Sequence, residues 1–181
     1  PLRSAQPFYK DGSPYLLGGD HVGRDVFSRG LYGARISLTV MFVAMSAGMI
    51  IGTSLGLVSG YAGGVVDEVI TRIVDIWLGF PFLLLALVVA ITVGASFTVV
   101  MFLMVLLAWS GFVRNVRADV LVLKESDYVA SAKVAGASTL RILTRHILPG
   151  TVGTITVIAS LSVGSLILAE ATLSFLGAGI P

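Results

Sequence analysis

Three long runs without a charged residue constrain this 181-residue chain more than any other feature. No Asp, Glu, Lys or Arg occurs in residues 36–66, 76–113 or 147–169. A helix that crosses the hydrocarbon core of a bilayer needs about 20 predominantly apolar residues, and each run is long enough. Charged residues make up only 12% of the chain, against ~25% in ordinary soluble domains. The chain is therefore expected to be a membrane protein.

The middle run is too long for a single span. At about 1.5 Å per residue, one helix of that length would exceed the hydrocarbon thickness by roughly twofold, so the chain must turn within the run. The predicted turn lies at Gly94-Ala95-Ser96. The fold class that follows is an all-α membrane protein, a transmembrane helix bundle with about four spans near 36–58, 74–94, 97–113 and 150–170.

Basic residues indicate the orientation, because Lys and Arg near span ends favour the cytoplasmic side. With four spans, the short loop at 67–75 and the long loop at 114–146 lie on the same side. That side carries Arg72, Arg114, Arg117, Lys124, Lys133, Arg141 and Arg145, whereas the other side has Arg24, Arg29 and Arg35 near its span ends. The long loop is therefore expected in the cytoplasm, and the protein in the cell membrane as a multi-pass protein.

Charge and composition also argue against several function classes. The net charge is +2, and the basic residues lie where membrane orientation already explains them, so no nucleic-acid partner is expected. The chain has no cysteine, which excludes disulfides and thiolate metal sites, and no metal site is predicted. His21 and His146 fall on opposite sides of the membrane, and no pair of carboxylates or nucleophile with a base appears. No catalytic residue is predicted, and the protein is not expected to be an enzyme.

The chain divides into an external segment, residues 1–34, and a transmembrane domain, residues 35–181. In the external segment, Asp25 can cap a short helix whose Phe27, Leu31 and Ala34 form an apolar strip suited to the headgroup region. This segment either docks a partner or simply leads into the first span.

The first span has glycines four residues apart at Gly48, Gly52, Gly56 and Gly60. Residues at this spacing share one helix face, and the missing side chains allow another backbone to approach closely. The pattern predicts tight helix packing on that face.

The second span begins with Arg72 and Asp75, three residues apart, and contains Pro81. We expect the two charges to pair on one face at the inner end of the span, and the proline to permit a kink.

The last span carries several hydroxyl groups among apolar neighbours. In hydrocarbon such groups bond to their own helix or face a protein interior. Thr156, Ser160 and Gly164 are therefore candidates for lining a translocation path, with plain packing against other helices as the alternative.

Within the long loop, residues 114–149, the sequence predicts two short helices joined at a glycine. The first runs over 127–135 with small side chains that offer a slim surface, and Gly136 suits the residue just after a helix end. The second begins at Ser138 as its N-cap and runs to Pro149. We expect its Leu140, Leu143 and Ile147 to hold it against the bundle, and Arg141 and Arg145 to face water or lipid phosphates.

These residues resemble the EAA-x3-G-x9-I-x-LP pattern of the cytoplasmic loop in binding-protein-dependent ABC importer permeases. The chain has Ala130-Ser131-Ala132, then Gly136, then His146-Ile147-Leu148-Pro149. It departs from the pattern at Ala130 (Glu in the family), Ser131 (Ala) and His146 (Ile). Three more blocks, residues 18–38, 67–81 and 168–179, are similar to the dipeptide, oligopeptide and nickel branch of this family.

The resemblance implies a type I importer permease whose coupling loop inserts into a cleft of a cytoplasmic ATPase. It assigns ATPase docking to residues of the two short helices and their junction, and contact with an extracytoplasmic binding protein to the external segment. The docking residues are Asp127, Tyr128, Ala130, Ser131, Ala132, Gly136, Ala137, Ser138, Leu140 and Arg141; the residues facing the binding protein are Asp20, Arg24, Asp25 and Arg29. It further implies one span before Pro1 and one after Pro181.

The expected function is that of a permease subunit of an ATP-driven ABC importer that moves a small solute, with di- or oligopeptides favoured over nickel or another small solute. The chain has no GxxxxGK[ST] phosphate loop, so ATP and Mg²⁺ are expected on a partner ATPase and no cofactor on this chain. The expected partners are a second permease chain, two ATPase subunits or domains, the binding protein and the bilayer. An ion-coupled secondary transporter or a channel is the alternative from another class.

Overall fold

The structure is a computed structural model that describes residues 9–10, 13–14, 17–19, 24–94 and 96–177. The chain divides into two compact units, residues 1–40 and 41–181. Within the described residues of the chain, almost all regular structure is helical, which confirms the all-α fold class. The exception is a two-residue antiparallel ladder between β1 (Tyr9–Lys10) and β2 (Ser13–Pro14).

In the first unit, Asp25 caps the start of α1 (Val26–Ala62), as its sequence context predicts. Its carboxylate accepts hydrogen bonds from the backbone N–H groups of Phe27 (3.1 Å) and Ser28 (3.2 Å). The prediction of a separate short helix is wrong, because the same helix continues into the first span. No proline interrupts it, and glycines at 30 and 33 weaken a helix without ending it.

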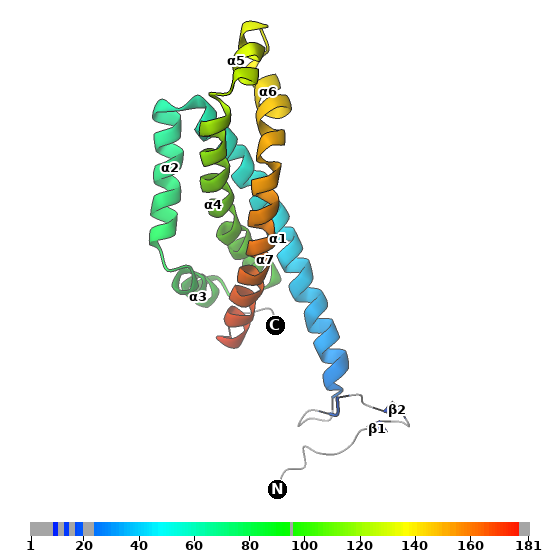
Figure 1. The fold of residues 1–181 in the computed structure, drawn as a ribbon. Coiled ribbons are helices and arrows are strands. Elements are labelled where there is room, and N and C mark those ends of the chain that lie inside the picture. The colour runs from blue at the N-terminus through cyan, green and yellow to red at the C-terminus, as the bar shows by residue number, and fades with distance from the viewer. Residues whose placement is uncertain (1–8, 11–12, 15–16, 20–23, 95, 178–181) are drawn as a thin grey trace. The chain divides into compact units, whose positions relative to one another are not determined.

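The second unit is a helical bundle (Figure 1). After α1, its elements are α2 (Gly64–Gly79), α3 (Phe82–Val93), α4 (Phe97–Leu123), α5 (Asp127–Val134), α6 (Thr139–Ile142), the π-helical turn η2 (Leu143–Ile147) and α7 (Leu148–Phe175). Figure 1 shows α5 at one end of the bundle, where α4 ends and α6 begins.

Three helices are long and apolar enough to cross a membrane, and α2 with α3 forms a fourth span if this bent pair is counted as one. The chain turns between Val93 and Phe97, as predicted, and Ser96 caps α4 by accepting the backbone N–H of Val99 (3.3 Å). The spans predicted at 36–58, 97–113 and 150–170 lie within α1, α4 and α7, whereas the span predicted at 74–94 falls on the last part of α2 and on α3, which a 78° bend separates.

The helices extend farther than the uncharged runs on the loop side. Residues 67–75, predicted as a loop, are helical in α2, and α4 continues to Leu123. The second loop helix does not end at Pro149 but passes through η2 into α7. Charge marks where the hydrocarbon ends, whereas a helix continues into the aqueous layer until a glycine or a cap stops it.

The glycine face of α1 packs directly against α4. A Cβ atom added to Gly52 would lie 2.4 Å from the carbonyl oxygen of Trp109, and one added to Gly48 would lie 2.5 Å from the Cβ of Ala108. Gly56 and Gly60 meet Val116 and Val120 in the same way. The absent side chains let the two backbones approach closely, which is how helices gain packing contacts where lipid supplies no hydrophobic drive.

The expected kink at Pro81 is a break. Helix α2 ends at Gly79, Phe80 is extended, and α3 starts after Pro81 at an angle of 78° to α2. Proline lacks the N–H that would continue the helix ladder, and it restricts the preceding residue to extended conformations.

Candidate coupling loop

Helix α5 is a single short helix whose C-terminal end is closed by backbone hydrogen bonds. Ser126 precedes it, and Gly136 follows at φ +76°, a left-handed conformation that glycine adopts without strain. The N–H of Ala137 donates to the carbonyl of Ala132 (3.0 Å) and that of Gly136 to the carbonyl of Lys133 (3.0 Å). These bonds satisfy carbonyls that the helix end would otherwise leave open, as in a Schellman motif.

The second helix begins as its sequence predicts, with the hydroxyl of Ser138 accepting the N–H of Arg141 (3.4 Å). The predicted packing face is wrong in part. The side chain of Leu140 is 71% exposed, whereas Ile142 and Ile147 are buried. The cause is η2: a π-helical turn contains one extra residue, so side chains five apart share a face where an α-helix would align those four apart.

The docking residues predicted from the sequence gather on one exposed surface, which we call the α5 surface. Its exposed members are Asp127, Tyr128, Ala130, Ser131, Gly136, Ser138, Leu140 and Arg141, while Ala132 and Ala137 are partly buried. Three of the eight side chains on α5 are small, those of Ala130, Ser131 and Ala132, so a partner can approach the helix backbone closely at this point. Leu140 adds an exposed apolar side chain beside it.

One buried side chain fastens α5 to the bundle. Val129 is fully buried in a cluster with Leu57 of α1, Val120 of α4 and Ile142 of α6. The partly buried side chains of Ala132 and Ala137 pack against the same cluster. The α5 surface is therefore the outer side of a hydrophobic core that reaches three neighbouring helices, and α5 cannot be displaced without moving that core.

The end of α1 also contacts α5 through a cation and an aromatic ring. The Nζ of Lys133 lies 5.5 Å from the centre of the Tyr61 ring. At this distance the ammonium is attracted to the ring face, by about 0.5–1 kcal/mol at an exposed site. Tyr61 also packs on the Val129 cluster, so the contact adds to the attachment of α5 to α1.

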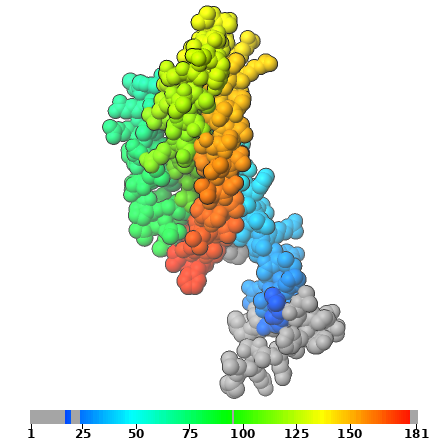
Figure 2. Space-filling view, viewed as in Figure 1, coloured from blue at the N-terminus to red at the C-terminus, as the bar shows by residue number. Residues whose placement is uncertain are grey.

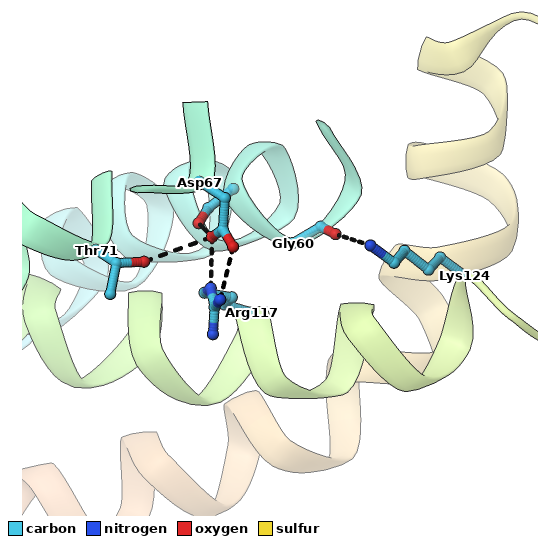
Figure 3. A network of polar contacts seen from close by, with 6 residues as sticks. Gly60, Asp67, Thr71, Arg117 and Lys124 are labelled. Carbon is cyan, nitrogen blue, oxygen red and sulfur yellow. Dashed lines mark hydrogen bonds and ion pairs between the residues drawn. The ribbon is translucent and has the colours of Figure 1, made fainter. Parts of the chain in front are cut away.

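Next to this core, an ionic cluster joins three helices (Figure 3). The guanidinium of Arg117 on α4 binds the carboxylate of Asp67 on α2 through two N–H groups, with Nη2 2.6 Å from Oδ2. The hydroxyl of Ser59 on α1 donates to the same carboxylate, and so does that of Thr71 (3.4 Å). We call these four residues the Asp67 cluster. Its ion pair keeps little solvent contact, with side-chain exposures of 30% for Arg117 and 16% for Asp67.

Lys124, just after α4, closes the end of α1. Its Nζ donates to the carbonyl oxygen of Gly60 at 3.0 Å (Figure 3). The last carbonyls of a helix have no partner within it, and a basic side chain at that end also interacts favourably with the helix dipole. The turn between α1 and α2, at Gly63 and Gly64, is therefore flanked on both sides by bonds to the end of α4.

The predicted pair of Arg72 with Asp75 is wrong. Arg72 lies 3.8 Å from Glu68, four residues earlier on α2, and Asp75 binds Arg114 of α4 at 2.9 Å. The pair of Arg72 with Glu68 is local to α2, whereas the partner of Asp75 approaches only in the folded bundle. The Asp67 cluster joins residues 50 positions apart, so no local spacing indicates it.

The residues predicted to face a binding protein lie in the first unit, apart from Asp20, which is outside the described residues. Arg24 and Arg29 are exposed, and Asp25 is occupied as the cap of α1. The hydrogen bond from the Ser28 hydroxyl, followed by those from backbone N–H groups, lowers the pKa of the Asp25 carboxyl. Among the residues that the structure describes, no three His, Asp or Glu side chains gather so as to hold a metal ion.

The candidate path residues lie on exposed positions of α7, which Figure 2 shows at the surface of the bundle. The hydroxyls of Thr156 and Ser160 bond to carbonyls of their own helix, those of Val152 and Thr156, both at 2.9 Å. Gly164 is exposed and meets no neighbouring side chain.

Comparison with known proteins agrees with this architecture. Residues 52–181 match the family described as the binding-protein-dependent transport system inner membrane component. The chain is 44% identical to the glutathione transport system permease protein GsiD of Pectobacterium atrosepticum, over 92% of this chain and 56% of that protein. It is 41% identical to the dipeptide transport system permease protein DppC of Bacillus subtilis, over 92% of this chain and 52% of that protein.

A third relative, the dipeptide transport system permease protein DppC of Haemophilus influenzae, is 42% identical over 95% of this chain and 59% of that protein. The chain thus spans somewhat more than half the length of these curated relatives. The family match covers most of the chain, including α2 to α7, and the apolar helices place it in the membrane as a multi-pass protein. The chain belongs to the binding-protein-dependent transport system inner membrane components, the permeases of ABC importers, and is similar to their peptide branch.

Proposed function

We propose that this chain is the transmembrane subunit of an ATP-driven importer for di- or oligopeptides, and that its α5 surface docks into a cytoplasmic ATPase. The observation that carries the proposal is the combination found at α5: a slim exposed surface on the outside and Val129 fully buried on the inside. Such an element can receive a displacement from a partner and pass it to the helices behind it.

The proposed assembly contains two ATPase subunits or domains, a second permease chain and an extracytoplasmic binding protein. ATP and Mg²⁺ belong to the ATPase, in keeping with the absence of a phosphate loop in this sequence. The names of the relatives, which refer to dipeptide and glutathione transport, support a peptide-type solute. Arg24 and Arg29 in the first unit are the proposed contacts of the binding protein.

The proposed mechanism is a rigid-body displacement. Closure of the two ATPase subunits moves α5, and the Val129 cluster transmits this movement to α1, α4 and α6. The Asp67 cluster and Lys124 make the start of α2 part of the same body. After the start of α2, the next point along the chain where it can bend is the break between Gly79 and Phe82. We therefore expect α3 to reorient relative to α2 as the bundle changes between inward-open and outward-open states.

The test uses the full-length permease reconstituted with its partners in proteoliposomes, with dipeptide uptake and ATP hydrolysis measured together. Gly136→Pro removes the positive φ and the N–H that closes α5, so uptake per ATP hydrolysed should fall at least tenfold. Gly136→Asn is the matched control, because asparagine tolerates the left-handed conformation, and it should keep most of the coupling. Unchanged coupling in Gly136→Pro would reject α5 as the docking element.

A further inference from the structure

A groove follows one face of α7 beside α4. It has a volume of about 680 Å³ and is lined by Gly153, Thr154, Val157, Ile158, Leu161, Ser162 and Ser165 of α7 and by Asn115 of α4. The α7 residues form two columns four residues apart, 153-157-161-165 and 154-158-162, which is the spacing of one helix face. From 153 to 165 the groove runs about 18 Å along the helix, more than half of the hydrocarbon thickness.

The hydroxyl groups of α7 fall into two sets. Six of them bond to their own helix, those of Thr151, Thr156, Ser160, Ser165, Thr172 and Ser174. The hydroxyls of Thr154 and Ser162 have no hydrogen-bond partner among the described residues, and both line the groove. They lie eight residues apart, in the same column.

A third polar group, the side chain of Asn115 on α4, also lines the groove. The amide nitrogen of Asn115 donates to the carbonyl of Gly111 at 2.9 Å, which fixes the side chain and leaves its Oδ1 as a hydrogen-bond acceptor. A hydroxyl that has no hydrogen-bond partner in hydrocarbon is unfavourable. A Ser or Thr in a helix can avoid this cost by bonding to a carbonyl of its own helix, but Thr154 and Ser162 do not make that bond. Two such hydroxyls and an amide along one groove point to a surface that meets water or a polar ligand.

We propose that this groove is a contact surface for the solute in transit, with Asn115, Thr154 and Ser162 exchanging hydrogen bonds with the amide groups of a short peptide. This inference rests on the proposed import function and names a part of the path. The groove offers donors and acceptors but no charged side chain, so it suits the neutral peptide backbone common to different peptides. Its contacts are few and its apolar residues are small to medium in size, which allows a solute to leave as readily as it enters.

This assignment differs from the sequence prediction. Thr156, Ser160 and Gly164 lie on other faces of α7, and the first two hydroxyls are already bonded to their own helix. Thr154 and Ser162 therefore each have a matched control two residues away, Thr156 and Ser160, that differs in hydrogen bonding and not in chemical type.

The first experiment compares isosteric or near-isosteric substitutions in the full-length permease, assembled with its partners and assayed for dipeptide uptake. Thr154→Val and Ser162→Ala should each raise the KM for uptake several-fold, whereas Thr156→Val and Ser160→Ala should change it less than twofold. Protein yield and thermal unfolding of the four variants should be similar, since none of these hydroxyls holds helices together. Equal effects of the groove and control substitutions would overturn the proposal.

The second experiment does not depend on transport. These 181 residues contain no cysteine. With any cysteine elsewhere in the membrane-embedded complex replaced, single cysteines at 154, 162, 156 and 160 report access of a charged, membrane-impermeant thiol reagent. Reaction should be at least tenfold faster at 154 and 162, and a transported dipeptide should slow it. Slow reaction at 154 and 162 would mean that lipid or another helix covers the groove, and would overturn the proposal. Fast reaction in an assembly that takes up no peptide would instead reject the proposed import function and leave a water-exposed groove.

Discussion

Asp67 and Arg117, 50 positions apart in the chain, form a two-bonded ion pair between the start of α2 and the end of α4. The pair lies beside the Val129 cluster and receives a third bond from Ser59 of α1, so three helices meet at a single carboxylate. Among the described residues, Val74 is the one buried side chain of α2. Polar contacts with α4 therefore help to hold this helix in place, together with the ring contact between Trp77 and Trp109.

The first prediction concerns the unequal strength of two ion pairs between α2 and α4. Arg117→Ala leaves Asp67 partly buried without its cation and should lower the free energy of unfolding in detergent by about 2–3 kcal/mol, below the roughly 3–5 kcal/mol typical of fully buried pairs. Arg114→Ala removes a pair whose side chains are 62% and 47% exposed, and should cost less than about 1 kcal/mol. A double-mutant cycle with Asp67→Ala and Asp75→Ala measures both couplings, and equal values would contradict the account.

The second prediction concerns the close contact between α1 and α4. Gly52→Ala places a Cβ against a backbone carbonyl that cannot move aside, so the helices must separate, at a cost of about 1–3 kcal/mol. Gly111→Ala is the control, because a Cβ at that position of α4 meets nothing within 4 Å. Thermal unfolding of the two variants in the same detergent should show a lower midpoint for Gly52→Ala alone.

The third prediction follows from the π-helical turn between α6 and α7. Deletion of the exposed Thr144 removes the extra residue of η2 and should give a regular α-helix in which Ile142 and Ile147 remain on the buried face. Deletion of the exposed Ser160 within regular α7 rotates everything after it by about 100°, which turns Leu166 and Leu173 out of the core. The first variant should fold as a monodisperse protein in gel filtration and the second should aggregate. Aggregation of the Thr144 deletion together with normal folding of the Ser160 deletion would show that η2 does not contain an extra residue.

The fourth prediction concerns the pH dependence at the start of α1. Asp25 caps the helix as a carboxylate, and hydrogen bonds lower its pKa in the folded state. Because the pKa is lowered on folding, the cap is fully effective above the unfolded pKa of about 3.9 and is lost as the pH falls through the folded value. Hydrogen exchange of the Phe27 and Ser28 amides, corrected for intrinsic rates, should therefore speed up at low pH. Asp25→Asn keeps a cap that does not titrate, and should show no such change.

The sequence alone predicts the helices well and their contacts poorly. Uncharged runs locate the spans in α1, α4 and α7, and the turn chemistry at Gly136 and Ser138 locates both ends of the junction in the coupling loop, because these features depend on a few adjacent residues. The second predicted span, 74–94, instead falls across the 78° break between α2 and α3. The glycine spacing of α1 indicates a tight face, but the sequence does not name α4 as its neighbour.

The failures share a physical cause. Arg72 and Asp75 share a helix face, which favours a pair between them, yet Asp75 binds Arg114, which approaches only after α4 has packed. Regular α-helical spacing predicts Leu140 on the packing face, but one extra residue in η2 is enough to bury Ile142 and expose Leu140. Tertiary contacts and helix irregularities decide both cases, and neither leaves a local signal in the sequence.

The most direct test of the central claim is a site-specific crosslink from α5 to the ATPase. A photoreactive amino acid at the exposed Ser131 of the full-length permease, expressed together with its ATPase in intact cells, should give one crosslinked product that contains the ATPase. The same amino acid at the exposed Thr98, near the start of α4, should give none. An ATPase crosslink at Thr98 with none at Ser131 would contradict the account, because the α5 surface would then not be where the bundle meets its source of energy.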